Sequence, residues 1–287
     1  MLLDNLFVMS QYLTPQHALS RTIGKLADSQ NPLIKDTFIN WFAQRYQVNL
    51  SEALRENTSD YKSFNDFFTR ELKPGARPIA EGEDILACPV DGAVSQLGNI
   101  EYGQIFQAKG HSFSVIDLLG GDMERAKPFM GGKFATIYLS PKDYHRIHMP
   151  LEGTLREMIY VPGKLFSVNP LTTENVPGLF ARNERLVAIF DTALGPVAMV
   201  LVGAMIVAAI ETVWAGQVAP PARTLKTTRY DSPSNITLAK GEEMGLFKLG
   251  STVVMAFPPD SIEWDEALAP AGSVRLGQPL AKRIKKA

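Results

Sequence analysis

This 287-residue sequence has a single cysteine, almost no net charge and few long apolar runs. The single cysteine, Cys88, excludes an intramolecular disulfide and a zinc site made of cysteines alone. Its neighbours Ala87 and Pro89 favour a small buried side chain over a reactive thiol. Lys and Arg together number 29 against 30 Asp and Glu, so a net charge of −1 gives no basic field for nucleic acid.

The most apolar stretch, residues 197–210, is followed at once by Glu211. It is shorter than the ~20 residues that a membrane-spanning helix needs, so we expect buried strand or core there. The N-terminus carries Asp4 and has no basic segment before its apolar residues, unlike a secretory signal. Together these features predict a cytoplasmic protein that touches a membrane only from its surface.

Residues 1–75 read as a helical N-terminal region. Apolar residues recur there at helical spacing, Pro32 stands near a helix start, and Ser63 is typical of an N-cap before a helix that stops at Pro74-Gly75. Amphipathic helices of this kind either pack on the protein's own core or insert one apolar face into a membrane interface. The sequence leaves both interpretations open.

Residues 76–287 read as a β-rich domain, which makes the predicted fold α+β. From Asp84 onward, short β-branched runs alternate with Gly and Pro, as in a largely antiparallel core. Leu194-Gly195-Pro196 lies between two apolar runs and indicates a hairpin. The basic tail, residues 280–287, is either a solvated end or a contact for anionic lipid.

Two of the four histidines, His145 and His148, lie in the segment SPKDYHRIHMPLEG. A spacing of three places them together on a helical turn and on opposite faces of a strand. They are either ordinary surface or core histidines or part of a reactive site. Zinc ligation with Asp91 or Asp143 is a weaker alternative, because no third histidine is near in the sequence.

Asp91 and Ser251 have ordinary local interpretations. Asp91-Gly92 is typical of a turn, and Ser251 lacks the glycine flanks of a G-x-S-x-G nucleophile elbow. However, Asp91, His148 and Ser251 are the residue types of a nucleophilic relay, in which a serine needs a base and the base needs an orienting carboxylate. Sequence spacing does not show whether the three meet.

Several blocks of the chain, in order, resemble the bacterial, membrane-associated phosphatidylserine decarboxylase family. The blocks span nearly the whole sequence and end with the family's Leu-Gly-Ser-Thr at 249–252. They are FNDFFTRELKPGARPI (64–79), CPVDGAVSQLG (88–98), AKGHSFSV (108–115), YLSPKDYHRIHMPLEGTL (138–155), GKLFSVNP (163–170), NERLV (183–187), VGAMIVAAIETVWAG (202–216) and GEEMGLFKLGSTVVMAF (241–257).

The resemblance implies a precursor that cleaves itself between Gly250 and Ser251. The products are a β chain of residues 1–250 and an α chain of residues 251–287, whose first residue becomes a covalent pyruvoyl cofactor. The resemblance assigns His148 to deprotonate Ser251 and Asp91 to orient the imidazole. A glycine at the cleaved carbonyl suits this chemistry, since it has no Cβ to obstruct the serine oxygen.

The implied reaction serves phospholipid biosynthesis. The pyruvoyl group forms a Schiff base with phosphatidylserine in the membrane, and loss of CO2 gives phosphatidylethanolamine. His145 is our candidate for acid or base work in that step. The resemblance further implies a homodimer of αβ units, held peripherally on the cytoplasmic side of the cell membrane, with no metal. Two alternatives remain: an unprocessed serine hydrolase that uses Ser251, His148 and Asp91, and a non-catalytic membrane-associated module.

Overall fold

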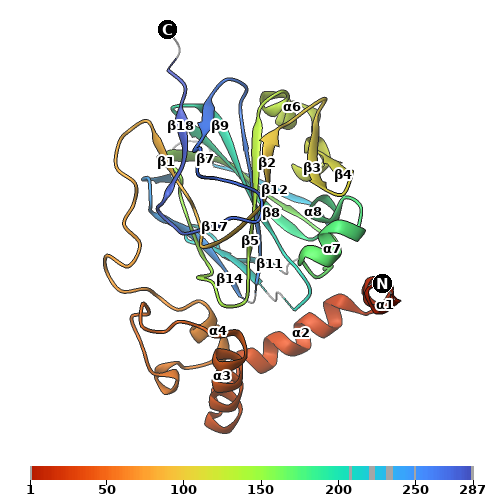
Figure 1. Ribbon diagram of the computed structural model, residues 1–287, viewed down its shortest axis with the longest axis vertical. Coiled ribbons are helices and arrows are strands. Elements are labelled where there is room, and N and C mark those ends of the chain that lie inside the picture. Colours follow the sequence, from red (N-terminus) through yellow and green to blue (C-terminus); the bar gives the residue numbers. More distant parts are fainter. Residues whose placement is uncertain (1, 207–208, 220–223, 231–234, 249, 286–287) are drawn as a thin grey trace.

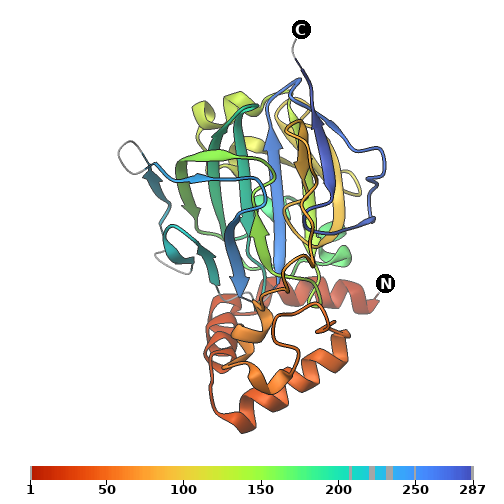
Figure 2. The ribbon, with the colours of Figure 1, turned by 90° about the vertical axis from the view of Figure 1, so that its left-hand side faces the viewer.

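The computed structural model describes residues 2–206, 209–219, 224–230, 235–248 and 250–285. A helical N-terminal region lies at one end of the molecule, and a β-sheet core occupies the rest (Figures 1 and 2). The predicted α+β fold is therefore confirmed. Among the described residues, no helix is long and apolar enough to cross a membrane.

The N-terminal region contains four α-helices and a 3-10 turn, whose ends follow local capping rules. Asn31 accepts a hydrogen bond from Leu33 N, and Ser63 accepts one from Asp66 N. The helix that Ser63 opens ends at Phe68, so our prediction that it continues to Pro74-Gly75 was wrong, because the cap at Thr69 already closes it. The elements are α1 (Leu2–Leu13), α2 (Gln16–Ala27), α3 (Pro32–Tyr46), η1 (Thr58–Asp60) and α4 (Phe64–Phe68).

A separate small core holds α3 and α4 together. Phe42 of α3 packs edge-on against Phe64, Phe67 and Phe68 of α4, and all four side chains are buried. Some of the helical residues therefore pack on the protein itself, as one of the two sequence interpretations expects.

The core contains one nine-stranded antiparallel sheet with the order β12-β7-β8-β9-β15-β5-β2-β17, in which β13 also pairs with β7. Its strands are β2 (Gly92–Asn99), β5 (Lys133–Leu139), β7 (Gly153–Val161), β8 (Arg185–Thr192), β9 (Gly195–Val202), β12 (Lys226–Arg229), β13 (Thr237–Leu238), β15 (Ser251–Phe257) and β17 (Ser273–Val274). The hairpin predicted around Gly195 joins β8 to β9, where Thr192 faces Gly195. The apolar stretch at 197–210 supplies most of β9, as a buried strand.

Smaller sheets and short helices surround this sheet. The four-stranded sheet β11-β10-β14-β6 and the three-stranded sheet β1-β18-β16 flank it, and β3 pairs with β4. The strands are β1 (Ile85–Ala87), β3 (Gln104–Ala108), β4 (His111–Ser114), β6 (Arg146–His148), β10 (Ala209–Thr212), β11 (Gly216–Ala219), β14 (Glu243–Lys248), β16 (Ile262–Trp264) and β18 (Pro279–Arg283). The helices are α5 (Val115–Leu118), α6 (Met123–Ala126), η2 (Lys127–Phe129), α7 (Pro170–Asn175) and α8 (Leu179–Arg182).

The segment 247–257 is not one strand. Its first residues belong to β14, which pairs with β10 and β6, whereas Ser251 begins β15, which pairs with β5 and β9. The chain therefore changes from one sheet to another at Gly250. Leu249, the first residue of the Leu-Gly-Ser-Thr motif, lies outside the described residues.

Candidate functional site

The predicted cleavage point lies at the start of a central strand. Gly250 has a φ of +62°, in the left-handed region that favours glycine, and a Cβ added to it would meet no atom within 4 Å. The backbone of Ser251 pairs with Leu139 of β5 at the first rung of the ladder. The structure describes this backbone but not the Ser251 side chain. Backbone conformation, rather than a lack of space, therefore calls for glycine at position 250.

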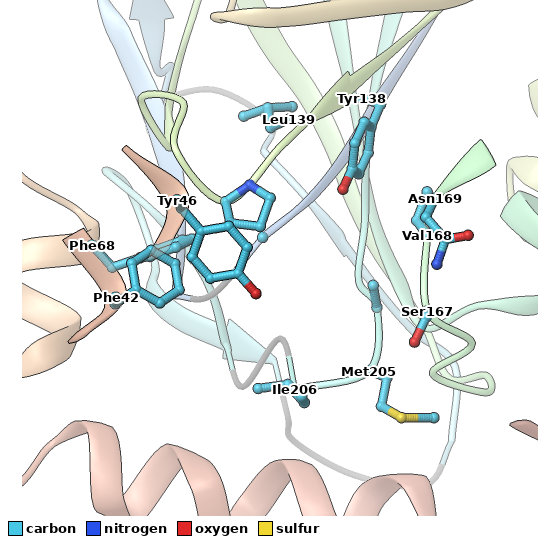
Figure 3. Close-up of a pocket in the computed structure, with 13 residues that line it drawn as sticks. Phe42, Tyr46, Phe68, Tyr138, Leu139, Ser167, Val168, Asn169, Met205 and Ile206 are labelled. Carbon is cyan, nitrogen blue, oxygen red and sulfur yellow. The ribbon is translucent and has the colours of Figure 1, made fainter. Parts of the chain in front are cut away.

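Gly250 lines a cavity of about 310 Å³ between the helical region and the sheet. The rings of Phe42, Tyr46 and Phe68 form one side (Figure 3). Opposite them lie the side chains of Tyr138, Ser167 and Asn169, with Met205 and Ile206 below (Figure 3). The cavity thus combines an aromatic wall with a wall that carries hydroxyl and amide groups, and both border the cleavage point.

His148 is a partly buried imidazole whose hydrogen bonds fix its tautomer. Nδ1 lies 2.8 Å from the carbonyl oxygen of Gly241, which only accepts, so Nδ1 carries the proton. Nε2 lies 3.2 Å from the Tyr144 hydroxyl and therefore presents its lone pair to that group. Burial lowers the pKa of His148 below its usual 6.5, so the ring is neutral at pH 7 and has a basic nitrogen.

Asp91 lies in the turn between β1 and β2, as predicted, and its carboxylate is buried. Two guanidinium nitrogens of Arg77 donate to it: Nη2 lies 2.6 Å from Oδ2, and Nε lies 2.9 Å from Oδ1. The amide of Leu276 donates to Oδ1 at 2.8 Å. Leu276 belongs to the predicted α chain, so Asp91 links the two predicted chains.

The structure brings Asp91 and His148 close together without a direct bond. The His148 amide donates to Pro89 O at 2.9 Å. Burial has the largest effect on the pKa of the imidazole and lowers it, whereas the Gly241 hydrogen bond and the charges of Glu243 and, least, Asp91 act to raise it. Among the hydrogen bonds of the described residues, Gly241 rather than Asp91 receives the Nδ1 proton.

His145 lies behind the aromatic wall of the cavity. Its side chain is fully buried, and its ring centroid is 4.0 Å from that of Phe68, which lines the cavity. Nδ1 donates to Asp143 O, and Nε2 is buried with no hydrogen-bond partner. Burial, assisted by the positive charge of Arg70, lowers the pKa of His145 to about 3. The ring is therefore neutral and has one unused acceptor.

Several residues of this site carried no recognisable signal. Arg77 stands in the block ARPI, but nothing local connects it with Asp91. Gly241 binds His148 across 93 residues of sequence, which local patterns do not reveal. Cys88 is buried as predicted, and burial raises the pKa of its thiol to about 12. The described residues contain no group of three or more His, Cys, Asp or Glu side chains arranged to hold a metal.

Comparison with known families decides among the interpretations. A sequence model described as phosphatidylserine decarboxylase matches residues 64–282, about three quarters of the chain. The chain belongs to the phosphatidylserine decarboxylase family. A second family model, described as PSD, matches residues 6–47, so the helical N-terminal region is also matched. The resemblance drawn from the sequence blocks is therefore confirmed.

Curated relatives of this family are similar over nearly the full chain. A phosphatidylserine decarboxylase proenzyme of Hahella chejuensis is 66% identical over 284 residues, which cover 99% of this chain and 96% of the relative. A protein of the same name from Pseudomonas putida is 63% identical over 98% of this chain and 99% of the relative. Another from Stutzerimonas stutzeri is 60% identical over 281 residues.

Proposed function

We propose that this phosphatidylserine decarboxylase is made as a precursor that cleaves itself between Gly250 and Ser251 and then acts on lipid bound in the adjoining cavity. The observation that carries the proposal is that Gly250, at the cleavage point, lines the cavity between the aromatic and the polar walls. The activity is pyruvoyl-dependent decarboxylation of phosphatidylserine, which gives phosphatidylethanolamine.

Self-cleavage needs a base and an accessible carbonyl. The Ser251 oxygen adds to the Gly250 carbonyl carbon, the C–N bond breaks, and an ester replaces the peptide. Removal of the Ser251 Cα proton then expels the Gly250 carboxylate, and hydrolysis of the resulting dehydroalanine releases ammonia. The neutral His148, with its Nε2 lone pair, is the proposed base, and the open space beside Gly250 leaves room for the attack.

Asp91 is proposed to assist His148 through its charge. As His148 takes up a proton, a nearby carboxylate stabilises the imidazolium that forms. In the described structure the Nδ1 proton is held by Gly241 O, which fixes the ring orientation that the sequence assigned to Asp91. Arg77 in turn holds Asp91 in place.

The cavity fits the covalent group that cleavage leaves on residue 251, because Gly250 lines it and the space at Gly250 is open. When formed, that group supplies a ketone conjugated to a carbonyl, which takes up the electron pair left by departing CO2. Tyr138, Ser167 and Asn169 are proposed to bind the polar headgroup through their hydroxyl and amide groups. His145, behind Phe68, stays the candidate for acid or base work in this step, and its unused Nε2 acceptor favours the base role.

We also propose that α1–α3 bind the membrane surface peripherally, on its cytoplasmic side, beside the cavity. Large apolar side chains of these helices are exposed to solvent, Leu13 by 83% and Leu33 by 82%, and Trp41 of α3 is also exposed. A homodimer of αβ units stays a prediction, which sedimentation of the processed protein would test.

Intact-mass analysis of the purified protein tests the cleavage. We expect two fragments that meet between residues 250 and 251, with a pyruvoyl mass on the smaller one. Ser251→Ala should stay whole at 31.6 kDa and inactive, because it lacks the nucleophile. As a matched control, Ser261→Ala removes a hydroxyl whose one hydrogen bond among the described residues is to Pro258 O, and it should cleave normally. An intact, active wild type would instead support a serine hydrolase, and an intact, inactive one a non-catalytic module.

A further inference from the structure

Helices α1 and α2 carry buried polar side chains where amphipathic helices usually place apolar ones. Gln11, Gln16 and Ser20 are exposed by 3%, 6% and 3%. Buried amides and hydroxyls are unfavourable unless they are hydrogen-bonded, so each of these groups needs a partner inside the protein. Those partners lie in the two segments that form the cavity wall, residues 165–169 and 204–206, whose members Ser167 and Ile206 line the cavity.

The three side chains accept hydrogen bonds from backbone amides of the wall. Leu165 N donates to Gln16 Oε1 at 2.7 Å, and Ser167 N donates to Gln11 Oε1 at 3.1 Å. Ile206 N donates to Ser20 Oγ at 3.0 Å. Ser167 and Ile206 themselves line the cavity, and the helix below them is visible in Figure 3.

Side-chain hydrogen bonds, rather than strand pairing, hold residues 165–169 of the wall. Residues 165–169 belong to no β-ladder, so their amides depend on side-chain acceptors. Two other side chains contribute. Thr172 Oγ1 accepts from Asn169 N and donates to Ser167 O. Asn183 Oδ1 accepts from Phe166 N, and its Nδ2 donates to the carbonyls of Phe166 and Gly203. Asn183 thus joins the two wall segments to each other, and the helices join them to the N-terminal region.

The link between the two helices is itself part of this arrangement. Gln16 Nε2 donates to Gln11 O at 2.6 Å across the break at Pro15, so the two glutamines fix the relative placement of α1 and α2. His17 adds a bond from its Nε2 to Gly163 O at 2.9 Å. The same helices carry the exposed apolar side chains Leu6, Met9 and Leu13.

We propose that Gln11, Gln16 and Ser20 are positioning residues that hold one wall of the substrate cavity against the N-terminal helices. The helices that are proposed to meet the lipid surface therefore also set where Ser167 and Ile206 stand in the cavity. This inference rests on the proposed role of the cavity as the lipid site. It gives α1 and α2 a task in substrate binding that is separate from membrane attachment.

Hydrogen exchange resolved to single amides tests the contacts without any catalysis. In the uncleavable Ser251→Ala precursor, Gln16→Leu should speed exchange of the Leu165 amide by about tenfold or more, because that amide loses its acceptor. The Phe166 amide, which Asn183 holds, should keep its rate. Thr22→Val is the matched control, since the Thr22 hydroxyl donates to Ala18 O of the same helix and has no other partner in the described part of the chain.

Kinetics with a short-chain, soluble phosphatidylserine test the consequence without a membrane. Gln11→Leu should raise KM by about tenfold with kcat within about twofold, since the wall but not the reacting carbonyl is disturbed. Gln11→Glu keeps an acceptor oxygen for Ser167 N and should restore KM. Self-cleavage reports whether each variant has folded. If a glutamine variant fails to cleave, Ser20→Ala, which deletes only one hydroxyl, replaces it in the same measurements.

Unchanged exchange at Leu165 together with an unchanged KM would overturn the inference. Acceleration spread evenly over the sheet amides would also overturn it, because the side chains would then act only on overall stability. A Gln11→Glu variant whose KM is as high as that of Gln11→Leu would also contradict the inference. An inactive wild type, by contrast, would speak against the proposed function, and the exchange result would still decide whether the helices hold the wall.

Discussion

His148 has a basic nitrogen at neutral pH because burial lowers its pKa. A base works in its neutral form, so a lowered pKa extends the working range toward acid. We predict that the first-order rate of self-cleavage is still unchanged when the pH is lowered to 6.5, and that it falls only at a pH below that value. Precursor from cell-free translation, shifted to buffers between about pH 5 and about pH 8, would supply the rates on denaturing gels.

Two variants bracket this pH experiment. His148→Ala should block or severely slow cleavage at every pH, and His111→Ala, on strand β4, should reproduce the wild-type profile. A half-maximal rate at or above pH 6.5 would remove His148 from the role of base.

Gly250 and Gly75 form a matched pair for a second prediction. Both have positive φ, +62° and +79°, and an added Cβ would meet no atom within 4 Å at either position. Alanine at each should therefore cost about 1 kcal/mol of stability through backbone strain alone. Only Gly250→Ala should also slow self-cleavage, because it shifts and crowds the attacked carbonyl. Urea unfolding and gel-based cleavage rates separate the two effects, and equal cleavage rates would contradict the prediction.

At the scale of elements, β15 predicts what happens to the α chain after cleavage. Its backbone pairs with β5 from Ser251 to Phe257 and with β9 from Thr252 to Ala256, so neighbours hold it on both sides. Residues 1–250 and 251–287 should co-elute on gel filtration and separate only in denaturant. A fragment of residues 251–287 that elutes by itself under native conditions would contradict this.

How far the sequence predicts the elements depends on the distance between partners. The helix start near Pro32, the cap at Ser63 and the hairpin at Gly195 were predicted, because each is decided by residues a few positions apart. The division of 247–257 between two sheets was missed, since the partners of β14 and β15 lie elsewhere in the chain.

The site shows the same limit. Asp91, His148 and Ser251 could be named from motifs, and they still await a test of their roles. The contacts that orient them could not be named: Leu276 reaches Asp91 across 185 residues of sequence, and Gly241 reaches His148 across 93. Only the folded topology brings such partners together.

At the scale of the whole molecule, the helices and the basic C-terminal strand lie at opposite ends. Figure 2 shows α1–α3 at one end and β18, which contains Lys282 and Arg283, toward the other. Lys285 is paired with Asp84. A membrane that contacts the helices would thus face away from this strand, which favours the solvated interpretation of the tail.

Flotation with liposomes tests the helical surface. Leu13→Asp combined with Leu33→Asp should abolish co-flotation, because both exposed side chains would no longer bury apolar area in the interface. Tyr102→Asp changes a still more exposed residue in a turn of the sheet domain and should float like the wild type. Full flotation of the double variant would exclude the helices as the attachment surface.

The change of sheet beside Gly250 also has a consequence for folding before and after cleavage. The proposed cut falls between two ladders, so cleavage there would remove no strand pairing from either sheet. Once the mature protein is unfolded, the two chains must find each other again, so refolding becomes second order in concentration. The intact precursor refolds at a rate that does not depend on concentration. We therefore expect folding to precede the proposed cut, and the mature protein, once unfolded, to refold at a rate that depends on the concentration of both chains.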